Sequence, residues 1–156
     1  MAQTKSQRTV PVVLIVVAVA LIAARVAAHW FTPEKKASLV QWVPLEQVGQ
    51  LAAATNKFIL IDFTAEWCEP CHQLDAEVFG DPALSSEINR RFLAVRVTDR
   101  KREEGRNPAY IQQLEQRYHV NSYPTVVFVD AGGLERARME GYGGPEQFKR
   151  IMESVR

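Results

Sequence analysis

The residue pattern with the clearest chemistry is a pair of cysteines, Cys68 and Cys71, in the sequence Trp-Cys-Glu-Pro-Cys-His at 67–72. Two intervening residues let both sulfur atoms meet across the first turn of a helix. Free backbone N–H groups and the helix dipole would stabilise a thiolate on Cys68 there. A thiolate attacks disulfides, and Cys71 is placed to resolve the mixed disulfide that results. A bridge between them would close too short a loop to add much stability, which argues against a purely structural role.

His72 leaves two alternatives open for the same motif. Cys-x-x-Cys-His is also the pattern for covalent haem attachment, with His72 as the axial ligand. The second axial ligand would be one of three side chains: Met139, Met152 or His119. A zinc site of Cys68, Cys71, His72 and His119 is disfavoured because the adjacent Cys71 and His72 chelate awkwardly. We expect thiol chemistry with no metal and no cofactor, because a buried strand leads into the motif.

The cysteine pair requires elements that hold it in place, and the sequence supplies alternating strands and helices. Apolar runs predict strands over 57–63, 92–97 and 125–129, and a hairpin return over 134–139. Helical spacing and proline starts predict helices over 45–55, 67–79, 82–91, 108–118 and 145–155. This alternation is typical of an α/β fold with a mixed central sheet and helices on both faces. Basic residues between Arg90 and Arg106, Arg96 among them, are interleaved with acids, and we expect them on a solvated face or loop.

Two segments resemble the thioredoxins. The run Phe-Ile-Leu-Ile-Asp-Phe-Thr-Ala-Glu-Trp-Cys-Glu-Pro-Cys at 58–71 is similar to their strand and active-site turn. The run Val-Asn-Ser-Tyr-Pro-Thr-Val-Val-Phe-Val-Asp at 120–130 is similar to their cis-proline loop and following strand. Glu77-Val78-Phe79 and the extended stretch at Thr98-Asp99 further resemble the exported carboxy-terminal domain of transmembrane disulfide-interchange reductases. The resemblance implies a thioredoxin-like fold.

The resemblance also implies roles for individual residues. It makes Cys68 the nucleophile, Cys71 the resolving cysteine and Pro124 the cis-proline beside the sulfurs. The backbone of Tyr123 would then pair with an extended substrate segment. Trp67 would shape the groove and shield the disulfide. Asp62, a buried acid in such proteins, would help to move a proton from the resolving cysteine, because desolvation shifts its pKa towards the useful range.

The dipeptide between the cysteines departs from the thioredoxin pattern. Thioredoxins have Gly-Pro between the cysteines and a lysine after the second, whereas this chain has Glu69-Pro70 and then His72. A carboxylate at Glu69 opposes ionisation of Cys68, while a protonated His72 favours it. The two effects have opposite signs, so the sequence does not fix the redox potential.

The amino-terminal segment predicts export. Residues 1–9 are polar and basic. Residues 10–31 form an apolar stretch, interrupted by Arg25, that ends at an aromatic edge; with Arg25 reaching outward it is about long enough for a signal anchor. Cleavage near Ala28 is the alternative, since small residues precede that site. We expect a tether over 32–43 and a thioredoxin-like domain over 44–156. The first 36 residues carry five basic and one acidic side chains, which leaves a net charge of −3 on the rest.

These features together predict an exported thiol–disulfide oxidoreductase, more specifically a reductase of protein disulfides. We expect it on the outer side of a bacterial inner membrane, held through residues 10–31, with the catalytic domain facing the periplasm. A membrane-embedded thiol donor would supply its electrons, and disulfide-containing exported proteins would be its substrates. Near-neutral charge argues against nucleic acid as a partner. A redox-inactive binding module with the same fold is the alternative of a different class.

Overall fold

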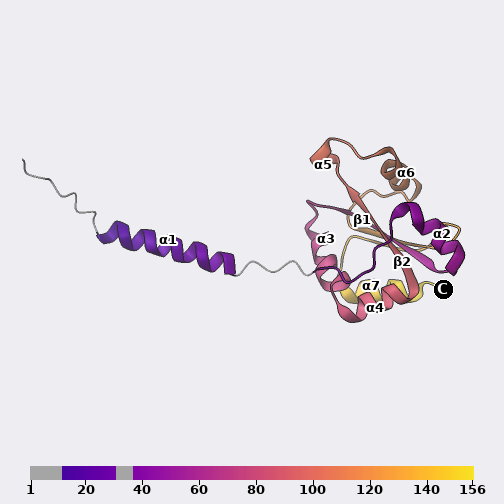
Figure 1. The fold of residues 1–156 in the computed structure, drawn as a ribbon, viewed down its shortest axis with the longest axis horizontal. Helices are drawn as coiled ribbons and strands as arrows, with labels where there is room; N and C mark the ends of the chain where they lie inside the picture. Colours follow the sequence, from indigo (N-terminus) through magenta and orange to yellow (C-terminus); the bar gives the residue numbers. More distant parts are fainter. Residues whose placement is uncertain (1–11, 31–36) are drawn as a thin grey trace, which may run out of the picture. The chain divides into compact units, whose positions relative to one another are not determined.

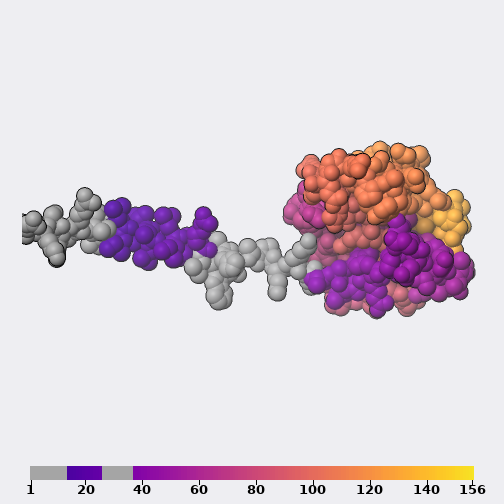
Figure 2. Space-filling model, turned by 45° about the horizontal axis from the view of Figure 1, so that its top comes forward, coloured from indigo at the N-terminus to yellow at the C-terminus, as the bar shows by residue number. Residues whose placement is uncertain are grey.

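The computed structural model describes residues 12–30 and 37–156 (Figure 1), which fall into two separate units, Met1–Lys35 and Lys36–Arg156 (Figure 2). The first unit contains α1, Val12–Trp30. Its apolar side chains, such as Leu14 and Leu21, are about 60% exposed, at 58% and 63%. In the described ranges no helix is long and apolar enough to cross a membrane. The ends of the predicted anchor, residues 10–11 and 31, lie outside these ranges.

The second unit is built on a four-stranded mixed sheet. Its strands are β1 (Phe58–Ala65), β2 (Phe92–Asp99), β3 (Thr125–Val129) and β4 (Glu135–Glu140), in the spatial order β2-β1-β3-β4. β2 runs parallel to β1, whereas β3 is antiparallel to both β1 and β4. β1 and β3 are central and almost wholly buried, which explains their continuous apolar sequences. The mixed α/β sheet predicted from the sequence is confirmed.

Helices cover both faces of this sheet (Figure 1). α2 (Leu45–Thr55) and α6 (Ala109–Arg117) bury Val48 and Ile111 with one set of strand side chains. On the other face lie α3 (Glu69–Leu74), the π-helical segment η1 (Asp75–Phe79), α4 (Pro82–Arg91) and α7 (Pro145–Ser154). Phe79, Ile88 and Phe148 from these elements are fully buried. Burial of both faces fixes β1, and therefore the turn that follows it, in place.

Three stretches differ from the prediction, and one of them is the short helix α5 (Lys101–Glu104), which no sequence pattern predicted. The helix expected over 67–79 begins at Glu69 and changes at Asp75 from α-helical to π-helical geometry. Part of the predicted tether packs on the domain: Val40 is 6% exposed, Trp42 forms a parallel bridge with Ala94, and the Val43 N–H donates to the Ala94 carbonyl at 2.7 Å. Residues 37–43 therefore belong to the folded unit, because Val40 and Trp42 pack into the hydrophobic core next to β2.

Candidate redox site

Cys68 and Cys71 are joined as a disulfide at the start of α3, with their Cα atoms 5.3 Å apart. Cys68 is the residue that caps the helix, and its Sγ accepts a hydrogen bond from the Cys71 N–H at 3.2 Å. The two residues are only 2% and 3% exposed. A helix-terminal N–H aimed at Sγ stabilises negative charge there, so Cys68 is placed to be the attacking thiolate once the bond is reduced.

An aromatic pair stands beside the disulfide. Trp67 is 42% exposed, and its ring meets Tyr123 edge-on with ring centres 5.9 Å apart. Tyr123 packs against the small apolar cluster of Ala65, Cys68 and Cys71. The guanidinium of Arg102 lies over the Trp67 ring, 3.7 Å from its centre. The structure therefore brings Trp67 and Tyr123, both expected to bind substrate, to the cysteine pair.

The loop before β3 offers free main-chain groups next to the site. The Tyr123–Pro124 peptide bond is cis, as the sequence comparison with thioredoxins led us to expect. Within the part of the chain that the structure describes, neither the N–H nor the C=O of Tyr123 makes a hydrogen bond. An extended segment of another protein could satisfy both groups, in the way that a strand adds to a sheet.

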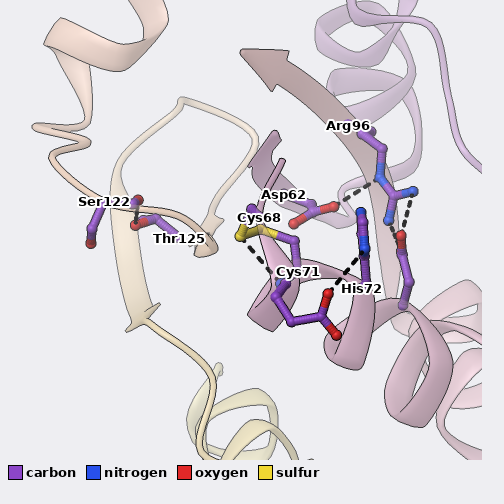
Figure 3. The surroundings of a disulfide bond; sticks show 9 residues. Asp62, Cys68, Cys71, His72, Arg96, Ser122 and Thr125 are labelled. Atoms are coloured by element: carbon purple, nitrogen blue, oxygen red, sulfur yellow. Dashed lines mark hydrogen bonds and ion pairs between the residues drawn. A yellow bond between two sulfur atoms is a disulfide. The ribbon is translucent and has the colours of Figure 1, made fainter. Parts of the chain in front are cut away.

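Asp62 lies inside β1 beside the disulfide (Figure 3) and is 1% exposed. Its Oδ2 accepts a hydrogen bond from Arg96 Nε at 2.8 Å, while its Oδ1 is buried without a partner among the described residues. Burial raises the pKa of Asp62 from 3.8 to about 6; Arg96 opposes this shift and the nearby Asp75 carboxylate adds to it. A carboxyl group with a free oxygen and this pKa can exchange a proton near neutral pH.

Arg96 is the residue of this site that sequence reasoning missed. It pairs with Asp62 from the adjacent parallel strand, in direct register, and with Asp75 of η1. Its guanidinium also lies 4.2 Å from the centre of the Trp42 ring. The expectation of a solvated position was wrong for Arg96, whose side chain is 27% exposed. The sequence did contain a signal for this pair: one acid, Asp62, stands in the first predicted strand, and one base, Arg96, stands at the matching position of the second.

Of the residues that suggested a cofactor, His72 lies at the surface of α3, whereas Met139 on β4 and Met152 on α7 are buried. His72 Nδ1 is 3.8 Å from Glu69 Oε2, and their side chains are 40% and 80% exposed. Across the described ranges, no group of three or more His, Cys, Asp or Glu side chains is arranged to hold a metal ion. The arrangement of the cysteine pair, the exposed tryptophan and the buried acid is that of a thiol–disulfide oxidoreductase.

Comparison with known proteins places that class in a family. The model of the thioredoxin-like domain matches residues 45–156, so the chain belongs to the thioredoxin-like domain family. The predicted fold and the predicted enzyme class are thereby confirmed. The family matched is one of thioredoxin folds, which supports thiol chemistry at Cys68 and Cys71 over haem attachment.

Individual relatives are consistent with this assignment. The thiol:disulfide interchange protein DsbD of Photorhabdus laumondii is 27% identical over 155 residues, which are 91% of this chain and 25% of that protein. The chain thus spans about a quarter of such relatives. A thioredoxin from Thermus thermophilus superposes with a TM-score of 0.61 at 26% identity, covering 74% of this chain and 86% of that one. The oxidised carboxy-terminal domain of Neisseria meningitidis DsbD gives 0.57 at 22% identity, covering 71% and 91%, and shows the same fold.

Proposed function

We propose that this protein reduces disulfide bonds of exported proteins, using Cys68 as the nucleophile and Cys71 as the resolving cysteine. The observation that carries the proposal is the buried pair at the start of α3, where the Cys71 N–H donates to Cys68 Sγ. The reducing direction is supported by homology to DsbD-type interchange proteins and by the resemblance to their exported reductase domain. Export is supported by the apolar segment at 10–31.

The reaction balances over two exchange steps. The Cys68 thiolate attacks one sulfur of the client disulfide, and the other client sulfur leaves as a thiolate. Cys71 loses its proton to Asp62 and attacks Cys68 Sγ, which releases the second client thiol and closes the Cys68–Cys71 bond. Two electrons have then passed to the client. A thiol donor must return two electrons to the domain, and we assign this role to a membrane-embedded dithiol protein.

The equilibrium of the cysteine pair with glutathione tests the direction. A reductase requires a potential near that of thioredoxin, about −270 mV, whereas a value of about −120 mV would mark an oxidant and overturn the reducing role. Cys68→Ser should abolish reduction of a protein disulfide, and Cys71→Ser should accumulate mixed disulfides with clients. Wild-type protein that reduces no protein disulfide, together with a Cys71→Ser variant that traps no client, would favour the binding-module alternative. A Soret band in the purified protein would instead favour haem attachment through His72.

The proposed location has its own test. We place residues 10–31 in the membrane as a single anchor, with the domain on the periplasmic side. The chain expressed in a bacterium should then remain in the membrane fraction after an alkaline carbonate wash, and added protease should reach the domain in spheroplasts. A soluble periplasmic product that begins just after Ala28 would support cleavage, and a cytoplasmic product would contradict export altogether.

A further inference from the structure

A buried polar network lies behind the redox site and is not part of the exchange chemistry. Asp99 at the end of β2, Asn107 before α6 and Glu115 on α6 are only 3%, 2% and 8% exposed. Asn107 Nδ2 donates to Asp99 Oδ1 at 2.6 Å and to both oxygens of Glu115 at 3.2 and 3.3 Å. Two buried carboxylates beside one amide are costly unless each finds donors.

Two further donors complete the network. Lys101 Nζ on α5 (Lys101–Glu104) donates to Glu115 Oε2 at 3.2 Å and lies 3.8 Å from Asp99 Oδ1. The Tyr123 hydroxyl donates to Glu115 Oε1 at 2.5 Å. Burial and the Glu115 carboxylate raise the pKa of Tyr123, so its hydroxyl remains protonated as a donor. Glu115 is therefore the acceptor that joins Tyr123 to the rest of the network.

This network reaches the disulfide through the Tyr123 ring. One end of the ring bonds to Glu115, and its body packs on Cys68, Cys71 and the edge of Trp67. The start of α5 also contacts these residues. The Arg100 N–H, just before α5, donates to Asn107 Oδ1 at 2.7 Å, and the guanidinium of Arg102 lies over the Trp67 ring. In the same residue, the main-chain N–H and C=O of Tyr123 make no hydrogen bond to any residue in the described ranges. The side chain is therefore held at its hydroxyl end, while the backbone of the same residue keeps its hydrogen-bonding capacity.

We infer that Glu115 is a positioning residue that fixes Tyr123 at the rim of the redox site, so that its free main-chain groups can pair with an extended protein client. The inference rests on the proposed exchange reaction with protein disulfides. The role concerns client docking and leaves the sulfur chemistry to Cys68 and Cys71. A small disulfide does not extend along the Tyr123 backbone, so it should not depend on the hydroxyl-to-carboxylate bond. Preference for protein over small disulfides is therefore the property that this network controls.

The experiment compares two substrates on the full chain, with dithiothreitol as the electron source. One is insulin, whose disulfides lie in a polypeptide, and the other is hydroxyethyl disulfide. Tyr123→Phe keeps the ring and removes the donor, and Glu115→Met removes the acceptor at similar size. Each variant should raise KM for insulin about tenfold, and Glu115→Met should leave kcat for insulin nearly unchanged and kcat/KM for the small disulfide within about twofold. The matched control is Tyr142→Phe, which removes another hydroxyl–carboxylate bond, 2.8 Å long, to Glu77. It should change neither substrate.

Further variants separate positioning from general structure. Glu115→Gln keeps an acceptor for Tyr123 and should restore most of the insulin preference. The double variant Tyr123→Phe, Glu115→Met should be no worse than Glu115→Met alone, since Glu115→Met already removes the bond that Tyr123→Phe removes. Equal loss on both substrates, or additive losses in the double variant, would overturn the inference.

The inference and the proposed function fail in different ways. Wild-type protein that oxidises reduced insulin but does not reduce it would overturn the proposed direction. The same variants would then be compared in the oxidising reaction, where a selective rise in KM would support the inference. Wild-type protein with normal insulin reduction, matched by unchanged KM in Tyr123→Phe and Glu115→Met, would overturn the inference alone.

Discussion

The charged residues in the two adjacent buried strands show how one side chain changes the chemistry of another. Asp62 would carry a substantial penalty as a buried anion, and Arg96 reduces that penalty by a direct hydrogen bond at 2.8 Å. Arg96 is shared with Asp75, so it does not fully neutralise Asp62. The result is a carboxyl group with a pKa of about 6, which is above the 3.8 of an ordinary aspartate and close to neutral pH.

Replacement of Asp62 by Asn should stabilise the fold at alkaline pH. The folded protein holds the Asp62 proton more tightly than the unfolded chain does, because burial raises its pKa from 3.8 to about 6. The free energy of unfolding of the wild type therefore falls as pH rises from about 4 to about 6. Asp62→Asn lacks this fall and should gain about 1–3 kcal/mol at pH 8 and little at pH 4. Urea unfolding at both pH values measures the difference.

The control for this experiment is an aspartate with the opposite shift. Backbone hydrogen bonds from Leu134 and Gly132 lower the pKa of Asp130, which lies at the surface of the β3–β4 turn. Asp130→Asn should bring no gain in stability at pH 8. An Asp62→Asn variant that is equally or less stable than the wild type at pH 8 would show that the Arg96 pair outweighs desolvation.

Replacement of Arg96 by Gln should move the pH profile of disulfide reduction. Arg96 lowers the pKa of Asp62, so its loss raises that pKa further, and Asp75 then acts on Asp62 unopposed. The acidic limb of the kcat profile should shift upward by about one pH unit. Arg138→Gln is the control, because Arg138 also bridges two carboxylates, Glu135 and Glu140, but on β4. An unshifted limb in folded Arg96→Gln protein would show that Asp62 does not govern this step.

Sequence reasoning found the residues that act through local pattern. Cys68, Cys71 and Asp62 are recognisable from a spacing and from a polar residue in an apolar run. Glu115 is different, because it belongs to a network whose members come from β2, α5, α6 with the residues just before it, and the loop before β3. No short pattern brings those four segments together, so the network becomes visible only in the folded chain.

At the scale of elements, the segment after the active site depends on how each helix begins. α3 starts at the capping Cys68 and passes into η1, whose wider π-helical turn carries Asp75 to Arg96 while Val78 and Phe79 are buried. The helical segment ends at Gly80, and α4 begins after Asp81. Asp81 Oδ1 accepts hydrogen bonds from the Ala83 and Leu84 N–H groups at 3.0 and 2.9 Å. Helical periodicity alone predicted a continuous helix, because a single π-turn does not alter the apolar pattern enough to be seen.

The cap of α4 is a separate target for substitution. Asp81→Ala removes the acceptor for two backbone N–H groups and should lower the free energy of unfolding by about 1 kcal/mol. Asp81→Asn keeps an acceptor and should lose only a few tenths of that amount. Thermal unfolding measures both variants, and insulin reduction by each should stay at the wild-type rate. A comparable loss in Asp81→Asn would show that the charge, and not the cap, matters.

At the scale of the molecule, the order of strands and helices was predictable because its signals are local. β1, β3 and α2 follow from apolar runs and from helical spacing after a proline. The boundary at the start of the domain was not predictable, since the apolar run at 37–43 is short and is interrupted by Ser38 and Gln41. Their place beside β2 depends on a long-range contact within the chain, between Trp42 and Ala94.

The strands at the two edges of the sheet affect how readily this protein would aggregate with partly folded polypeptides. The residues around Trp42 cover part of the β2 edge, and β4 carries Arg136, Arg138, Glu135 and Glu140, charges that discourage another strand from docking. A reductase of the proposed kind would meet partly folded polypeptides with exposed strands of their own. Guarded edges would lower the risk of co-aggregation with such polypeptides and would leave the Tyr123 backbone, which makes no hydrogen bond within the described ranges, as the proposed docking point for their extended segments.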